Sequence, residues 1–307
     1  MFTILLSILL SIIPSESASS IHLKKKINSE LTKNKGTFAL AYKDLSSGEE
    51  ILINEKISFH AASTMKTPVL IEAYKQASTG KFQIEDSILV KNEFKSIVDG
   101  SLYSLDSKDD SDVELYKREG KKVKIYDLLY LMIIKSSNLA TNLVIDLVGA
   151  KNVNNTMRQM GANDIQVLRG VEDNKAYRKG INNTTTAYDQ MLIFSEMANG
   201  KIVSPESSDA MISILIDQKF NDKIPAKLPN NVKVAHKTGW ITGVNHDAGI
   251  VLLPDGRKYV LVLLSKNLED DQAAVQSMAK VSRMIYQYFD RKTRSRTNLN
   301  RSSFGMM

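Results

Sequence analysis

The chain has 307 residues, of which 43% are apolar and 24% are charged, and these are the proportions of an ordinary soluble globular protein. It contains no cysteine, which excludes disulfides, thiol nucleophiles and thiolate metal sites. Part of the net charge of +7 lies in the last residues, where aromatic residues do not alternate with the basic ones. We therefore predict a solvated, disordered basic tail over residues 291–307 and no nucleic-acid-binding surface.

An apolar run from Phe2 to Ile13 begins the chain, and small residues follow Pro14. The run has the length of a signal-peptide core and is too short to span a bilayer comfortably. No lysine or arginine precedes it, so a short membrane-associated segment or a buried strand stays open as an alternative. We predict a signal peptide over residues 1–18, no stable membrane span, and export to the periplasm or the medium.

Several elements can be predicted in chain order. Alternating apolar residues on both sides of Ser46-Ser47-Gly48 predict a β-hairpin. A helical pattern begins at Ser63 and ends at Gly80. The polar, acidic stretch over residues 104–122 indicates a surface connection, and two apolar helices then meet at Ser136 and Ser137.

The last part of the chain changes character. After a helix that Thr184 to Thr186 would cap, three strand-like runs lie within residues 233–266, and an amphipathic helix follows them. Strands early and late with helices between them predict an α/β fold of the α+β type: one antiparallel sheet flanked by helices, with an inserted all-helical domain. We assign residues 19–60 and 211–290 to the sheet domain and residues 61–210 to the helical domain.

Three short motifs stand in a fixed order: Ser63-Thr64-Met65-Lys66, Ser136-Ser137-Asn138 and Lys237-Thr238-Gly239. The first opens a helix, the second is a turn between helices, and the third lies on a strand. Each motif is common alone, and Ser-x-x-Lys recurs at Ser78 and Ser277 in positions that do not suit a nucleophile. The combination in this order and on these elements is much more specific.

This motif set resembles that of the class A serine β-lactamases and the penicillin-binding proteins. The resemblance extends over roughly residues 30 to 290, because the hairpin before the first motif and the strands around the third also fit the class A branch. It implies a β-lactamase/transpeptidase-like fold and a serine β-lactamase that opens its small-molecule β-lactam substrate through an acyl-enzyme on Ser63. It implies no cofactor and no metal, and we expect a monomer.

Chemical roles follow for the motif residues. A serine at a helix N-terminus faces unpaired N–H groups that stabilise an oxyanion, and a desolvated lysine at position 66 could take its proton. The plain alternatives are a capping Ser63 and a solvated Lys66. The resemblance adds the other roles: Ser136 relays a proton, Asn138 binds the substrate amide, Lys237 and Thr238 hold a carboxylate, and Trp240 after Gly239 supplies a second oxyanion N–H.

For deacylation, the resemblance to class A enzymes implies a loop glutamate that activates water. Here Glu172 follows Arg169 by three residues instead of two, and the loop is shorter. Glu172 is the best candidate for the base, and the neighbouring Asp173 is the other candidate. An ion pair between Arg169 and one of these carboxylates is the structural alternative.

Further departures affect the second and third motifs. Ser137 stands where aspartate is usual, and His246 replaces the asparagine common before Asp247. We expect His246 to be a packed histidine and not a base, and we identify no arginine for the substrate carboxylate. These departures keep a peptidoglycan D,D-peptidase, an esterase on the same fold and a penicillin-binding sensor open as alternatives.

Overall fold

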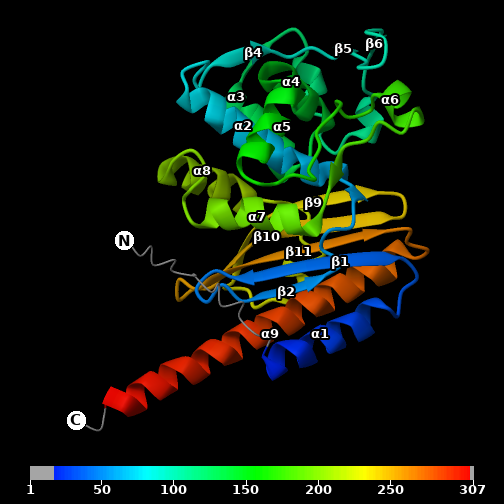
Figure 1. The fold of residues 1–307 in the computed structure, drawn as a ribbon. Coiled ribbons are helices and arrows are strands. Elements are labelled where there is room, and N and C mark those ends of the chain that lie inside the picture. Colours follow the sequence, from blue (N-terminus) through cyan, green and yellow to red (C-terminus); the bar gives the residue numbers. More distant parts are fainter. Residues whose placement is uncertain (1–16, 305–307) are drawn as a thin grey trace, which may run out of the picture.

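The computed structural model describes residues 17–304, with side chains through residue 292. Residues 1–16 of the predicted signal peptide lie outside this range. A sheet of five antiparallel strands runs through the lower half of the molecule in Figure 1, in the order β2-β1-β11-β10-β9. Its strands are β1 (Thr37–Asp44), β2 (Glu50–Ile53), β9 (Lys233–Ile241), β10 (Val244–Leu252) and β11 (Lys258–Lys266). The first two come from the start of the chain and the others from its end, so the predicted sheet is confirmed.

Helices cover both faces of the sheet (Figure 1). On one face, α1 (Ala18–Leu31) and α9 (Asp271–Phe304) enclose a core that contains Tyr42, Tyr259 and Phe289. On the other face lie α7 (Ala187–Ala198) and α8 (Pro205–Ile216). Because both faces are covered, β10 and β11 are buried along nearly their whole length, and β11 is apolar from Tyr259 to Leu264 without alternation.

The helical part forms the upper half of the molecule. It contains α2 (Lys66–Ser78), α3 (Ile125–Ile134), α4 (Asn138–Val148), α5 (Ala150–Gln159) and α6 (Asn174–Arg178). Short strand pairs join β4 (Ser87–Leu89) to β7 (Lys122–Lys124) and β5 (Phe94–Lys95) to β6 (Leu102–Tyr103). The 3-10 turns are η1 (Ala62–Met65), η2 (Ser107–Asp109), η3 (Tyr116–Arg118) and η4 (Pro225–Lys227).

The chain crosses between the two parts at a single strand pair. There, β3 (Phe59–His60) pairs with β8 (Thr184–Thr185). The residue after this pair, Thr186, caps α7 by accepting a hydrogen bond from the Asp189 N–H at 3.1 Å, as the sequence predicted. The pairing therefore fixes the segment that enters η1 and with it the position of Ser63.

Two segment boundaries of the structure differ from the predicted ones. The division predicted at residue 210 falls inside α8. The basic tail was predicted to be disordered from residue 291, whereas α9 continues to Phe304. The reason is local: no glycine or proline interrupts residues 271–304, and lysine and arginine are good helix formers. None of the helices described between residues 17 and 304 has the length and apolar character that a membrane span requires.

Candidate active site

A cavity of ≈ 920 Å³ opens where the helical part meets the edge strand β9. Most of the residues that the sequence predicted for the site line it: Ser63, Ser136, Asn138, Glu172, Thr238, Gly239 and Trp240. The two remaining predicted residues, Lys66 and Lys237, are fully buried and reach the site with their amines. Three motifs that are far apart in the sequence therefore meet in one place.

Ser63 lies in the 3-10 turn η1, and α2 begins immediately after it at Lys66. The preceding residue, Ala62, has a φ of 44°, a left-handed conformation that is unfavourable for alanine. Strand β9 approaches this turn closely, because a Cβ on Gly239 would lie only 3.1 Å from the backbone nitrogen of Ser63. Glycine at this position therefore lets the backbone N–H of Ser63 and the strand that carries Trp240 come together.

The amine of Lys66 is held by three acceptors. It donates to the carbonyl oxygen of Ser136 at 2.6 Å, to Ser136 Oγ at 3.1 Å and to Asn138 Oδ1 at 3.0 Å. Burial lowers the pKa of Lys66 to about 7, although the charges of Asp110 and Glu172 act in the opposite direction. A large part of the Lys66 population is therefore neutral near pH 7 and able to accept a proton.

Ser136 joins the two buried lysines. Its hydroxyl oxygen lies 3.1 Å from the amine of Lys66 and 3.1 Å from that of Lys237, which also donates to the carbonyl oxygen of Thr238 at 2.9 Å. Burial lowers the pKa of Lys237 well below its ordinary value, and the neighbouring charge of Lys66 lowers it further. Ser136 has a φ of 58°, so the turn that presents its hydroxyl is strained.

Glu172 lies in the loop before α6 and faces the cavity. The side chain of Asn138 connects it to Lys66, since the amide nitrogen donates to Glu172 Oε1 at 3.1 Å and the amide oxygen accepts from Lys66. Burial raises the pKa of Glu172, and the nearby carboxylates Asp109 and Asp110 add to this effect. A carboxylate with a raised pKa beside the motif serines is suited to general base chemistry.

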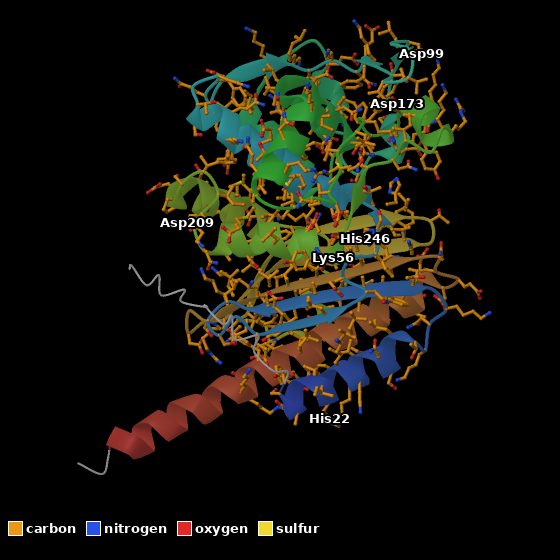
Figure 2. The ribbon with its side chains drawn as sticks, in the orientation of Figure 1. His22, Lys56, Asp99, Asp173, Asp209 and His246 are labelled. Carbon is orange, nitrogen blue, oxygen red and sulfur yellow. The ribbon has the colours of Figure 1, made fainter. Side chains whose placement is uncertain are left out.

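Asp173, the alternative base, points elsewhere. It is buried and accepts hydrogen bonds from Ser96 Oγ at 2.9 Å, from the Ile97 N–H at 2.9 Å and from the Ala176 N–H at 3.1 Å. Figure 2 places it in the helical part, away from the sheet. Asp173 therefore caps α6 and fixes the loop, and each of its two oxygens accepts a hydrogen bond that serves that purpose.

The alternative considered for the loop, an ion pair of Arg169 with Glu172 or Asp173, does not form. The guanidinium donates to the carbonyl oxygens of Ile181 at 2.9 Å and Gly170 at 3.1 Å, and to Asn182 Oδ1 at 3.1 Å. Two backbone oxygens and one side-chain amide oxygen near the loop thus accept from Arg169. Arg169 closes the loop without neutralising Glu172, which keeps its charge available to the cavity.

His246 is fully buried on β10 and has a structural role (Figure 2). Its Nε2 lies 2.8 Å from the carbonyl oxygen of His60, and its Nδ1 accepts from the Ser265 N–H at 3.2 Å. Nδ1 also lies 2.8 Å from the carbonyl oxygen of Asn245, so both ring nitrogens contact backbone groups. Burial lowers the pKa of His246 to about 4, so the ring stays neutral and ties the sheet to the segment before Ser63.

Two charged residues of the site were not found from the sequence. The stretch over residues 104–122 was predicted to be a surface connection, yet Asp110 within it is buried and accepts from the backbone N–H of Asn138 at 2.9 Å. Lys223, in the loop between α8 and η4, is 4% exposed and faces Asp222, with which it pairs at 3.0 Å. Both are charged residues in polar loops, where composition alone predicts exposure.

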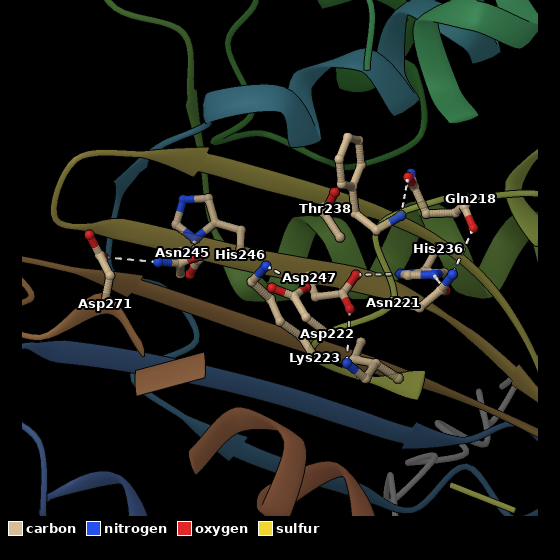
Figure 3. Close-up of polar contacts among 12 residues, drawn as sticks. Gln218, Asn221, Asp222, Lys223, His236, Thr238, Asn245, His246, Asp247 and Asp271 are labelled. Atoms are coloured by element: carbon tan, nitrogen blue, oxygen red, sulfur yellow. Dashed lines mark hydrogen bonds and ion pairs between the residues drawn. The ribbon is translucent and has the colours of Figure 1, made fainter. Parts of the chain in front are cut away.

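Hydrogen bonds connect the loop that carries Lys223 to the strand of the third motif (Figure 3). His236, the residue before Lys237, contacts Asp247 Oδ1 through Nδ1 at 2.8 Å, and the other oxygen of Asp247 accepts from the Ile224 N–H at 3.0 Å. Because both histidine and aspartate are fully buried, this contact fixes the loop against β9 and β10. Lys223 consequently lines the same cavity as Thr238.

Comparison with known proteins agrees with this geometry. The model of the β-lactamase enzyme family matches residues 22–289. β-Lactamase VEB-1 from Pseudomonas aeruginosa is 22% identical over 300 residues, which are 93% of this chain and 96% of that protein. The crystal structure of a β-lactamase from Sphaerobacter thermophilus shares 27% identity at a TM-score of 0.73 and covers 86% of this chain and 96% of its own. A mutant of PBP-A in its acyl-enzyme complex with penicillin-G shares 27% identity at a TM-score of 0.75 and covers 88% and 97%. The chain therefore belongs to the β-lactamase enzyme family, as a class A-like serine β-lactamase.

Proposed function

We propose that this serine β-lactamase hydrolyses the β-lactam amide through an acyl-enzyme on Ser63. The observation that carries the proposal is the convergence of Lys66 and Lys237 on the hydroxyl of Ser136, each at 3.1 Å, beside a serine held in a strained turn. Neutral Lys66 takes the proton of Ser63 Oγ, which attacks the carbonyl carbon. The backbone N–H groups of Ser63 and Trp240 then stabilise the oxyanion.

Ring opening requires a proton on the leaving nitrogen. The C–N bond breaks as Ser136 gives its hydroxyl proton to that nitrogen, and the Lys66 ammonium returns a proton to Ser136. The short contact between Lys66 and Ser136 supports this transfer. Lys237, on the opposite side of Ser136, holds the hydroxyl oriented and supplies positive charge for the substrate carboxylate.

Deacylation is assigned to Glu172. Its carboxylate takes a proton from water, the resulting hydroxide attacks the ester carbonyl, and Ser63 leaves with a proton returned through Lys66. Glu172 lines the cavity, and Asn138 orients it. Asp173 is not among the residues that line the cavity, and both of its oxygens accept hydrogen bonds within the loop region, which supports the choice between the two carboxylates.

Lys223 is proposed as the second cation for the substrate carboxylate, together with Lys237 and Thr238. It stands in place of the arginine that the sequence did not identify, and it lines the cavity beside the third motif. We expect Lys223→Ala to raise KM about tenfold with kcat retained, since it removes binding and no step of the chemistry. The matched control is Lys219→Ala, at an exposed lysine four residues earlier, and an equal change there would remove Lys223 from the site.

The test of the proposed function is the reaction of the purified protein with a chromogenic cephalosporin. Turnover beyond one equivalent, lost in Ser63→Ala and kept in Ser78→Ala, is the expected result. Ser78 makes a fair control because it also belongs to a Ser-x-x-Lys pattern but lies at the end of α2. Retained turnover in Ser63→Ala would remove Ser63 as the nucleophile.

A D,D-peptidase is the second candidate, because a mutant of PBP-A in its acyl-enzyme complex with penicillin-G is among the similar structures. A protein of that kind reacts with one equivalent of the cephalosporin and then stalls, with the acyl group detectable on Ser63 by mass spectrometry. Stalled wild-type protein would therefore favour the peptidase or a penicillin-binding sensor, and release of terminal D-alanine from a cell-wall peptide would distinguish these two.

We also propose that the protein is exported and acts as a monomer. The apolar run from Phe2 to Ile13 supports export. Expression of the full chain in a bacterium should give an extracytoplasmic protein whose N-terminus lies near Ser17 or Ala18. Light scattering of that product should give the mass of one chain, and a doubled mass would remove the monomer from the proposal.

A further inference from the structure

The carboxylate of Asp110 is buried against the second motif. Asp110 lies just after η2, and its Oδ2 accepts hydrogen bonds from the backbone N–H groups of Asn138 and Leu139, both at 2.9 Å, and from the hydroxyl of Tyr116 at 3.0 Å. Its other oxygen accepts from the Asp112 N–H at 3.1 Å. Both oxygens are thus occupied, and the residue is 7% exposed.

The two N–H groups belong to the first turn of α4, where backbone donors have no partner within the helix. A negative charge at this end of the helix is favoured by the dipole. The turn begins at Ser136, whose φ of 58° persists only if its surroundings hold it. Asp110 provides that restraint by holding the backbone N–H groups two and three residues after Ser136.

Ser137 does not provide it. Its hydroxyl accepts from the Ala140 N–H at 3.2 Å and so caps α4, but a serine has no second oxygen for the Asn138 and Leu139 donors. The Ser137 hydroxyl lies 3.5 Å from Asp110 Oδ2. The aspartate that is usual at position 137 is therefore absent, and a carboxylate from a different segment lies beside the serine hydroxyl found there.

We infer that Asp110 is a positioning residue of the acyl-transfer site, whose carboxylate fixes the Ser136–Asn138 turn in place of an aspartate at position 137. The inference rests on the proposed roles of Ser136 and Asn138. It also adds a role for the turn, which holds Lys66 through the Ser136 carbonyl oxygen and through the amide of Asn138. Displacement of the turn would move the proton relay and release Lys66 together.

Asp110 also acts through its charge. It raises the pKa of Lys66 and contributes to raising that of Glu172. The titratable groups that surround these two residues are Asp109, Asp110, Tyr116 and Lys237. Replacing Asp110 with asparagine should therefore lower the pKa of both the Lys66 amine and the Glu172 carboxyl, and a loss of stability alone would do neither.

The first test measures amide hydrogen exchange, which does not depend on activity. In Asp110→Asn, exchange at Asn138 and Leu139 should accelerate about tenfold, the effect of one lost hydrogen bond. In Asp110→Asn/Ser137→Asp it should return toward wild type, because aspartate is a favoured N-cap residue. The control is Asp112→Asn, a buried aspartate bound to Lys135 at 2.9 Å, which should leave these two amides unchanged.

The second test compares acylation rates and predicts a reversal of sign. Ser137→Asp alone should slow acylation, because it puts two carboxylates within about 3.5 Å. Asp110→Asn alone should lower the acylation rate about tenfold to a hundredfold. Adding Ser137→Asp to that protein should restore the rate. The acid limb of kcat/KM in Asp110→Asn should also move to lower pH.

These outcomes separate the inference from the proposed function. If Ser137→Asp recovers neither folding, nor exchange protection, nor rate in the Asp110→Asn protein, the positioning role of Asp110 is wrong. Unchanged exchange at Asn138 and Leu139 in a folded Asp110→Asn protein also overturns it. If the wild type itself fails to acylate, the proposed function is wrong, and the exchange measurements still decide whether Asp110 holds the turn.

Discussion

We expect the pH dependence of acylation to follow the buried amine of Lys66, the proposed base. With the ordinary pKa of 10.5, about one lysine in 3,000 would be neutral at pH 7, whereas a pKa of about 7 makes about half of them neutral. Burial therefore increases the population of the base about a thousandfold. Since only the neutral amine can take the proton of Ser63, the acylation rate should rise with pH through this pKa and level off above it.

The magnitude follows directly. Below pH 7 the rate should fall about tenfold for each pH unit, and above pH 8 it should be nearly constant. Lys66→Arg tests whether neutrality or positive charge is required, because arginine keeps the charge and the donors but cannot deprotonate in a protein. We expect a loss of acylation of about a thousandfold or more in this variant at pH 7.

The assay is stopped-flow acylation by a chromogenic cephalosporin between pH 5 and pH 9. Circular dichroism at each pH shows whether the protein remains folded. Competition with a non-reactive ligand at each pH shows whether the affinity of the site stays constant. An acylation rate that rises only near pH 10, or one that does not change between pH 5 and pH 7, would refute Lys66 as the base. A folded Lys66→Arg protein with a wild-type rate would refute it independently.

Three further predictions concern other parts of the site. Glu172→Gln should give a burst of one equivalent followed by an acyl-enzyme that persists, which mass spectrometry detects. Asp173→Asn should instead lower the stability by about 1–3 kcal/mol in thermal unfolding and should trap no acyl-enzyme. Because the unfolded chain binds a proton at His246 and the folded chain does not, the free energy of unfolding should fall by about 3 kcal/mol as the pH falls from 6.5 to about 4. In urea unfolding, His246→Gln should remove this dependence on pH. Gly239→Ala should lower kcat/KM about a hundredfold by pushing the Ser63 turn from β9, and a wild-type rate would show that the close approach is not needed.

Much of the fold could be predicted because its determinants are local. The strands around Ser46-Ser47-Gly48 alternate in hydrophobicity beside a turn, and Thr186 caps its helix from within the same segment. The motif residues could be predicted for the same reason, since Ser63 and Lys66 lie one helical turn apart. Their convergence with Ser136 and Lys237 depends on tertiary structure, and only the resemblance to a family indicated it.

The rest depends on contacts that no local pattern records. Asp110 stands in a run with several other acidic residues, and nothing in that run shows which side chain is buried. Its partners, Asn138 and Leu139, lie 28 and 29 residues further along the chain. The loop carboxylates are a similar case: Glu172 and Asp173 are adjacent and chemically alike, and only the donors around Asp173 separate their roles.

The charges of the site explain why these non-local carboxylates matter. Two lysine amines flank one hydroxyl at 3.1 Å, an arrangement that burial and mutual repulsion both oppose when the amines are charged. Asp110 and Glu172 partly offset this cost on the Lys66 side and so prevent its pKa from falling further. Lys237 has Asp247 as its compensating charge, and its pKa falls well below the ordinary value. With two carboxylate neighbours, Lys66 has a pKa of about 7 and is close to half protonated at neutral pH, which suits the proposed role of a group that both takes and returns a proton.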